Sequence, residues 1–283
     1  MRWYRVAGRH ALPWRLTRDP YAVLIAEVML QQTQVDRVLP YYLAWLGRWP
    51  TPGSLAQASI GDVIRAWGGL GYNRRAVSLH RATGVIEDGG GHVPREKSEL
   101  LALPGVGPYT ASAIASFAFE ERVPVADTNI ARVLARAVHG VASPRDLGVR
   151  QVAATALSLL PLRGARDHNL ALMDLGALIC TARGPACPEC PVREICAWRE
   201  AGYPASAAPS RPAPRFEGTA RFGRGRIIDA LRAAESLSEG ELADLLPEEH
   251  RPWVPRYLSA LQREGMAEQT AAGDWRLPVA KAE

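Results

Sequence analysis

Residues 20–200 of this chain repeat one pattern, in which apolar residues recur at helical spacing between short breaks that contain glycine or proline. The first segment begins at Pro20, directly after Thr17 and Asp19, and such side chains commonly cap helices. No alternating apolar pattern long enough for a sheet occurs in this region, so the pattern predicts an all-α body. The predicted helices cover residues 20–30 and about 36–48, 54–68, 74–88, 96–102, 108–118, 128–138, 147–160 and 168–179.

The composition changes at residues 203–215, where proline, alanine and serine dominate. Such a stretch buries no core and is typical of an extended linker. Beyond it, the sequence predicts three short helices and then a hairpin around Ala271-Ala272-Gly273. These elements indicate a small winged-helix-like module, with a plain helical appendage as the alternative. The predicted helices are 224–235, 238–246 and 252–264, and the hairpin arms are Met266–Gln269 and Asp274–Leu277.

The length of 283 residues fits about two domains. We expect a helical domain over 1–200, a Pro/Ala-rich linker over 201–220 and the winged-helix-like module over 221–283. The net charge of +5 is a mild signal for a polyanionic partner, and almost all positive charge is arginine. No apolar run approaches the ~20 residues that span a bilayer, and no targeting segment is visible. The sequence therefore predicts a cytoplasmic protein without membrane contact.

All four cysteines lie in one stretch, with the spacing C-x6-C-x2-C-x5-C. Four thiolates at such spacing can ligate a structural zinc ion or a 4Fe–4S cluster. Zinc usually takes two C-x2-C pairs, and only one is present here. Paired disulfides are a further alternative, but they are rare in chains without a signal peptide. Spacing alone leaves zinc and iron–sulfur open. The cysteines are Cys180, Cys187, Cys190 and Cys196.

The segment Leu103–Thr110, with the sequence LPGVGPYT, is the sharpest local motif in the helical body. Gly105 and Gly107 allow a tight turn whose backbone N–H groups point outward where the next helix begins at Pro108. That arrangement binds phosphate oxygens, and an ordinary turn between helices is the alternative. The flanking residues complete a helix-hairpin-helix signature, which predicts contact with a DNA backbone.

Two carboxylates are candidates for chemistry. Asp127 precedes a predicted helix, where it could serve simply as a cap. Glu27 lies in the apolar segment 22–30, either on a solvated face or buried. A buried glutamic acid has its pKa raised by desolvation, which suits a general acid near neutral pH. One protonated and one ionised carboxylate form the pair that glycosidic bond cleavage requires.

From about residue 13 to 200, the chain resembles the helix-hairpin-helix DNA glycosylases of the endonuclease III superfamily. Within that superfamily it is most similar to the MutY-type adenine glycosylases. The resemblance implies a two-lobed helical fold and a 4Fe–4S cluster on the cysteine loop 180–196. The matching pieces are Trp14-Arg15, Arg18–Tyr21, Glu27–Val35, Gly69–Tyr72, Leu103–Thr110, Asp127–Asn129, Met173–Gly176 and the four cysteines.

The resemblance also implies roles for individual residues. Glu27 matches the general acid that protonates adenine, and Asp127 matches the aspartate that stabilises the sugar cation. Gln31, Gln32 and Tyr72 match positions that wedge into DNA and contact the opposing base, with a solvated helix face or a core aromatic as the alternatives. The remaining positions that the resemblance places at the DNA or the base are Gly105, Gly107, Tyr109 and Asn129.

Several residues depart from the family pattern. Bifunctional relatives carry a Schiff-base lysine where this chain has Tyr109, and its only lysines are Lys97 and Lys281, so we expect a monofunctional glycosylase. Thr128 replaces a usual glycine, and Asn73 stands where a second tyrosine is common.

MutY enzymes also end in a Nudix-like domain that reads 8-oxoguanine, and nothing after residue 215 is strand-rich enough to be one.

The sequence therefore predicts a monomeric base excision repair enzyme that removes adenine mispaired with guanine or 8-oxoguanine in double-stranded DNA. In a bacterial cell we expect it at the nucleoid. The alternative is a thymine or uracil glycosylase acting on G·T or G·U mismatches, because related mismatch enzymes also carry tyrosine at position 109. A third reading is an iron–sulfur DNA-binding protein that has lost catalysis.

Overall fold

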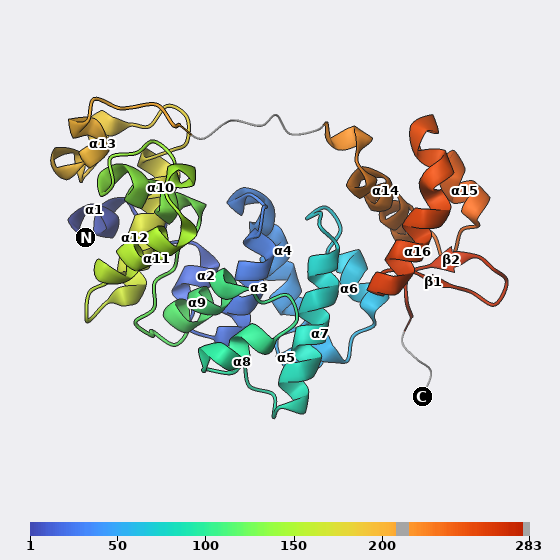
Figure 1. The fold of residues 1–283 in the computed structure, drawn as a ribbon. Coiled ribbons are helices and arrows are strands. Elements are labelled where there is room, and N and C mark those ends of the chain that lie inside the picture. Colours follow the sequence, from blue (N-terminus) through green and yellow to red (C-terminus); the bar gives the residue numbers. More distant parts are fainter. Residues whose placement is uncertain (208–214, 280–283) are drawn as a thin grey trace. The chain divides into compact units, whose positions relative to one another are not determined.

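The computed structural model describes residues 1–207 and 215–279, so residues 208–214 of the predicted linker lie outside the described residues. In the described ranges the chain is helical apart from one two-stranded hairpin, which confirms the all-α prediction (Figure 1). The helices are α1 (Arg2–Ala7), α2 (Pro13–Leu16), α3 (Pro20–Leu30), α4 (Val35–Arg48), α5 (Pro52–Ala56), α6 (Ile60–Ala66), α7 (Arg74–Asp88), α8 (Lys97–Ala102), α9 (Pro108–Phe117), α10 (Thr128–Ala137), α11 (Val149–Ser158), α12 (Ala165–Asp174), α13 (Ala197–Glu200), α14 (Ala220–Ala233), α15 (Glu239–Asp244) and α16 (Val254–Glu264). The strands are β1 (Glu268–Gln269) and β2 (Trp275–Arg276).

The described residues divide into two compact units. The first unit contains residues 1–24, 95–101 and 106–207, and the second contains 25–94, 102–105 and 215–279. The C-terminal segment thus clusters with residues 25–94. The predicted division into a 1–200 domain and a 221–283 module stays a prediction.

In the first unit, α10 contacts α11, α12 and α13. The apolar contacts continue past α12 through the π-helical turn η2 (Leu175–Ile179). Leu175 and Ile179 pack with Val133 of α10, and the partly buried Cys180 and Cys190 lie against this cluster. The packing of η2 therefore anchors the start of the cysteine segment on α10.

A buried ion pair ties the N-terminus of the first unit to the end of α12. The Asp174 carboxylate accepts hydrogen bonds from the Arg15 guanidinium at 2.5 and 2.7 Å, and from the backbone and side chain of Arg9 at 2.9 and 2.7 Å. Burial alone would raise the pKa of Asp174, but the bonds from Arg15 and Arg9 outweigh it and hold that pKa below its usual value. The Trp14-Arg15 and Met173–Gly176 motifs are thus joined by this pair.

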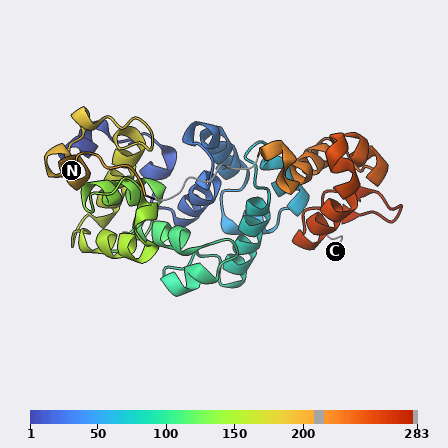
Figure 2. The same cartoon turned by 45° about the horizontal axis from the view of Figure 1, so that its top comes forward.

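In the second unit, the C-terminal helices share one apolar core with α6 and α7. Ile64 and Val77 pack in the same cluster as Ile227, Leu258 and Trp275. Figures 1 and 2 show α14 and α16 beside these two helices from both directions. The Gly61 N–H donates to the Pro278 carbonyl at 2.9 Å, which adds a backbone tie between α6 and the end of the described chain.

The C-terminal elements follow the predicted order of three helices and a hairpin. Strands β1 and β2 pair antiparallel, with Gln269 opposite Trp275. Leu237 and Trp275 also exchange two backbone hydrogen bonds of 2.8 and 2.9 Å, so the segment before α15 adds a bridge to the hairpin. The hairpin is thus extended by a residue that lies between α14 and α15 in the chain. This is the arrangement expected of a wing.

Two helix predictions were wrong in detail, and three short helices were missed. The helix predicted over 54–68 is split into α5 and α6, because the Ser59 hydroxyl accepts from the Asp62 N–H at 3.0 Å and starts a new helix. The helix predicted from 224 begins at Ala220, capped by Thr219. The short helices α1, α2 and α13 lie outside the predicted set, since four to six residues carry too little periodicity to be recognised.

Candidate functional site

Two turns of the second unit carry the predicted base-contacting side chains. Gln31 and Gln32 follow α3 directly, and Tyr72 ends the Gly69–Tyr72 turn that leads into α7. Gln32 and Tyr72 both have positive φ angles, of 55° and 48°. Such backbone conformations are uncommon for residues other than glycine and require support from the surroundings.

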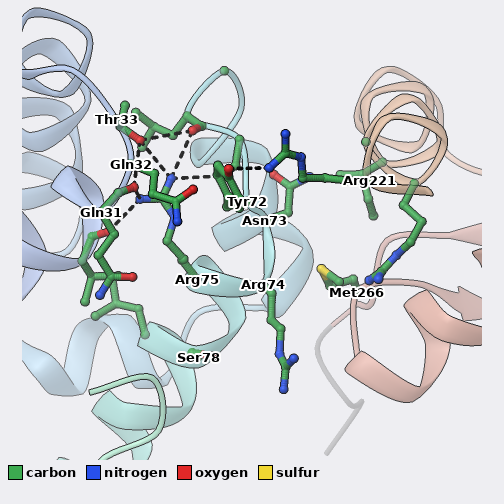
Figure 3. Close-up of a pocket in the computed structure, with 18 of the residues that line it drawn as sticks. Gln31, Gln32, Thr33, Tyr72, Asn73, Arg74, Arg75, Ser78, Arg221 and Met266 are labelled. Atoms are coloured by element: carbon green, nitrogen blue, oxygen red, sulfur yellow. Dashed lines mark hydrogen bonds between the residues drawn. The ribbon is translucent and has the colours of Figure 1, made fainter. Parts of the chain in front are cut away.

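Arg75 supplies that support. Its guanidinium donates to the carbonyls of Val28, Met29 and Gln31 on one side and to those of Leu70 and Gly71 on the other. Figure 3 shows Arg75 pointing toward Gln31 and Thr33. Burial lowers the pKa of Arg75 to about 10, so it remains charged at neutral pH. The sequence analysis missed Arg75, because its partners are main-chain atoms that only the two turns bring together.

Tyr72 lies at the surface, with an exposed fraction of 39%, so it is not a core aromatic. The guanidinium of Arg75 lies 5.5 Å from the ring centroid, and that of Arg221 lies 4.8 Å from it. Arg221 also donates to the Tyr72 hydroxyl, as the dashed line in Figure 3 shows. The sequence predicted Tyr72 but not its contact with the C-terminal segment.

These groups line a cavity of about 1060 Å³ in the second unit. Six arginines line it against two carboxylates. Both carboxylates are already paired, Asp229 with Arg232 and Glu264 with Arg224. The cavity is therefore strongly positive and suits part of a nucleic acid chain. The six arginines are Arg37, Arg74, Arg75, Arg221, Arg224 and Arg232.

The hairpin motif has the predicted turn. Gly105 has a φ of +80°, and a Cβ at this position would lie 2.7 Å from the Ser78 Cβ, so the turn requires glycine. Gly107 is the N-cap of α9, which begins at Pro108 as predicted, with Tyr109 in its first turn. The backbone N–H groups at the start of a ten-residue helix are suited to bind a phosphate oxygen.

Glu27 lies inside α3 and is buried, with an exposed fraction of 6%. Its neighbours in the helix are also buried, and Ile25, Ala26 and Met29 are fully so. A solvated helix face is therefore excluded for Glu27. A carboxyl group kept at such a position requires a partner or a function, because burial of its charged form is costly.

Asp127 lies at the N-cap of α10 in the first unit. Its carboxylate accepts from the Ile130 N–H at 2.6 Å and from the Asn129 side-chain amide at 2.8 Å. Burial raises the pKa of Asp127, and these two hydrogen bonds oppose the rise only in part. The capping role that the sequence left open is thus present, on a carboxylate that is also desolvated.

Arg132 connects Asn129 to the start of the cysteine segment. Its guanidinium donates to the Asn129 side-chain oxygen at 2.8 Å and to the Gly176 and Cys180 carbonyls, each at 2.6 Å. A Cβ at Gly176 would lie 2.7 Å from the Asn129 carbonyl oxygen. The Asp-Leu-Gly motif therefore allows η2 to approach Asn129 closely. The sequence analysis did not identify Arg132.

The four cysteines line one small cavity and none forms a disulfide, so the disulfide alternative is not what the structure shows. Arg136 also lines this cavity, donates to the Cys180 sulfur at 3.5 Å and stacks on Trp198 at 4.5 Å. Burial raises the pKa of the Cys187 and Cys190 thiols, and the neighbouring cysteines add to the rise. Among the described residues, no three His, Cys, Asp or Glu side chains are placed to hold a single metal ion.

The predicted site residues fall into two groups. Glu27, Gln31, Gln32, Tyr72 and Gly105 belong to the second unit. The first unit contains the other group, which is Gly107, Tyr109, Asp127, Asn129 and the four cysteines.

None of the described helices is both long and apolar enough to cross a membrane.

Residues 25–155 match the model of the HhH-GPD superfamily base excision DNA repair proteins. The adenine DNA glycosylase of Mycobacterium tuberculosis is 46% identical over 98% of this chain and 91% of its own length. Among solved structures, a thermostable thymine-DNA glycosylase has a TM-score of 0.66 at 32% identity, covering 71% of this chain and 93% of its own. A non-covalent endonuclease III–DNA complex follows with 0.62 at 25%, covering 71% and 92%.

These similarities explain why the positive cavity, the glycine hairpin and the desolvated carboxylate occur together in one helical chain. They also extend through the C-terminal segment, because the mycobacterial relative is aligned with almost the whole chain. The chain therefore belongs to the adenine DNA glycosylases, a family of DNA-binding glycosylases in the HhH-GPD superfamily of base excision DNA repair proteins.

Proposed function

We propose that this protein hydrolyses the N-glycosidic bond of adenine that is mispaired with guanine or 8-oxoguanine in double-stranded DNA. The observation that carries the proposal is the difference between its two carboxyl groups. Glu27 is buried in an apolar helix, whereas Asp127 accepts two hydrogen bonds that favour its ionised form. Glycosidic bond cleavage uses one carboxyl group as an acid and another as a carboxylate.

In this mechanism the adenine first leaves the helical stack, which is least costly at a mismatch. Glu27 donates a proton to a ring nitrogen of the base, and the bond from that base to C1′ breaks. The negative charge of Asp127 stabilises the sugar cation that develops at C1′. Water then adds to C1′ and gives its proton to Glu27, which restores the acid.

The reaction stops at the abasic site. Strand cleavage through a Schiff base needs an amine nucleophile, and position 109 is a tyrosine. The only lysines are Lys97, in α8, and Lys281, which lies outside the described residues. Borohydride trapping on abasic-site DNA should therefore give no strong covalent adduct. A strong adduct that survives Lys97→Ala would contradict this part of the proposal.

Double-stranded DNA with a mismatch is the proposed partner of a monomeric enzyme, located in a bacterial cell at the nucleoid. Gly105, Gly107 and Tyr109 contact the phosphate backbone through the hairpin, and Asn129 lies at the base. Gln31, Gln32 and Tyr72 contact the base opposite adenine. The positive cavity and the outward position of Tyr72 support this assignment.

The four cysteines are the proposed ligands of one 4Fe–4S cluster. Their shared cavity and the adjacent Arg136 fit this group, because a positive side chain offsets the negative charge of four thiolates. When bound, the cluster would supply a structural cross-link for the loop 180–196 and would take no part in the glycosidic bond chemistry. A brown protein that contains iron is the expected result, and a fully active, colourless protein with zinc alone would refute the assignment.

The alternative substrate is thymine or uracil opposite guanine, which the similarity to a thymine-DNA glycosylase supports. Duplexes that contain A·8-oxoG, A·G, T·G or U·G, treated with alkali after incubation, separate the two functions. We expect breaks only in the strands that contain adenine. Breaks confined to the thymine or uracil strands would replace the proposed function with the alternative.

A further inference from the structure

The C-terminal segment is fixed to the turn that presents Tyr72. Arg232 of α14 donates to the Asn73 side-chain oxygen at 2.7 Å and to the Ile64 carbonyl at 3.0 Å. Asn73 directly follows Tyr72, so this tie reaches the turn itself. It joins α14 to both ends of the connection between α6 and α7.

The start of α14 reaches the side chain of Tyr72 itself. The Arg221 guanidinium lies 4.8 Å from the ring centroid of Tyr72 and 4.8 Å from that of Phe216. Arg221 also donates to the Tyr72 hydroxyl. All three side chains are exposed and line the same cavity as Gln31 and Gln32. Figure 3 shows Tyr72 and Arg221 joined by their hydrogen bond at this cavity. Two aromatic rings therefore hold one guanidinium at the place where the resemblance puts the opposing base.

A guanidinium in this position has a defined recognition chemistry. Its planar N–H edge forms paired hydrogen bonds with the carbonyl and ring-nitrogen acceptors of guanine, and stacking on aromatic rings fixes the direction of that edge. 8-Oxoguanine keeps the carbonyl at C6 but carries a proton on N7, so the contact that it shares with guanine is the one to the C6 carbonyl. Adenine and 2-aminopurine lack it. The acidic side chains of the cavity are paired with other arginines. Arg221 uses Nη1 for its bond to the Tyr72 hydroxyl, so its other N–H groups are the ones that can face a ligand.

We propose that Arg221 recognises the C6 carbonyl of the purine opposite the excised adenine. The inference rests on the proposed function and extends it to a residue outside residues 13–200. Phe216 and Tyr72 act as positioning residues for the guanidinium. The hydrogen bond between Arg232 and Asn73 keeps α14 beside the turn that presents Tyr72.

The test measures the affinity of the full-length protein for duplexes that carry a non-cleavable adenine analogue opposite guanine or opposite 2-aminopurine. We expect the wild type to bind the guanine duplex about 10-fold more tightly, as one paired arginine–guanine contact provides. Arg221→Ala should reduce this ratio to near one. Arg221→Lys should reduce it as well while retaining much of the total affinity, because lysine keeps the charge but not the planar edge.

Arg226→Ala is the matched control, since Arg226 is exposed on the same helix but does not line the cavity, and it should keep the wild-type ratio. A ratio near one in the wild type, or an unchanged ratio in Arg221→Ala, would overturn the inference. An equal loss on both duplexes would also overturn it and indicate a phosphate contact. Failure of the wild type to release adenine from A·G or A·8-oxoG would instead overturn the proposed function, whatever the affinity ratio.

Discussion

Asp127 and Tyr72 are held in opposite ways. The Asp127 carboxylate is mostly buried, and two donors fix both of its oxygens. Tyr72 is exposed, and its support acts on the backbone, where Arg75 binds the carbonyls of the preceding turn. The proposed catalytic group is thus oriented through its own side chain, whereas the proposed base-contacting group is presented on a constrained backbone with its ring exposed. Catalysis and recognition should therefore fail separately.

The largest expected effect is on catalysis. Asp127→Asn and Glu27→Gln should each lower the single-turnover rate of adenine release by about 10²–10⁴-fold, since each removes a group that acts in the transition state. Affinity for the mismatched duplex should remain within about threefold of the wild type, as measured by fluorescence anisotropy. Near-normal turnover of Glu27→Gln would remove the assignment of Glu27 as the acid.

Arg75→Ala should impair stability and mismatch recognition instead of the catalytic step. Loss of its guanidinium leaves several partly buried carbonyls without a donor, and we expect the free energy of unfolding to fall by about 2–4 kcal/mol. Discrimination between mismatched and matched duplexes should fall with it. Arg74→Ala is the control, because Arg74 precedes Arg75 on the same helix and is exposed, whereas the guanidinium of Arg75 bonds the carbonyls of the two turns. Chemical denaturation measures the first effect and competition binding the second. An unchanged stability would show that Arg75 does not hold the turns together.

The dependence of the rate on pH tests the surroundings of Asp127. Because burial raises its pKa, a falling pH neutralises Asp127 earlier than an exposed aspartate, and the rate should decline at a correspondingly higher pH. Asn129→Ala removes a hydrogen bond that lowers this pKa, so the decline should move to still higher pH. Single-turnover rates between about pH 4 and 8 measure the shift. A shift toward lower pH in Asn129→Ala would contradict the account.

The smallest expected effect concerns the tie between α14 and the Tyr72 turn. A double-mutant cycle with Arg232→Ala and Asn73→Ala should give a coupling of about 1 kcal/mol in the free energy of unfolding, typical of a partly exposed hydrogen bond from a charged donor. The rate of adenine release should change little in either single variant. Strict additivity of the two substitutions would mean that their hydrogen bond does not contribute to stability.

The sequence predicted those parts of the site that depend on local chemistry. Glu27 stands out because its neighbours in the chain are apolar, and the Gly105 turn follows from the spacing of two glycines. Features that depend on distant contacts were missed. Arg15 and Asp174 are 159 positions apart, so no periodicity links them.

Arg221 was missed for a second reason. Gly223 and Gly225 lower the helix propensity at the start of α14, so the predicted helix began at 224 and left Arg221 outside it. In the structure, a Cβ at Gly223 would lie 2.4 Å from the Tyr257 ring, which shows that this glycine allows α14 to approach α16 closely. Packing therefore decides the start of the helix, and only the structure reveals it.

The most direct test of the central claim identifies the base that is set free. The wild-type protein should be incubated with duplexes that contain either A·8-oxoG or T·G, and the small-molecule fraction should be analysed by liquid chromatography and mass spectrometry. We expect free adenine from the first duplex, no free thymine from the second, and release of adenine that is at least about 100-fold slower with Asp127→Asn. Free thymine without free adenine, or adenine release at a near wild-type rate in Asp127→Asn, would contradict the proposed function.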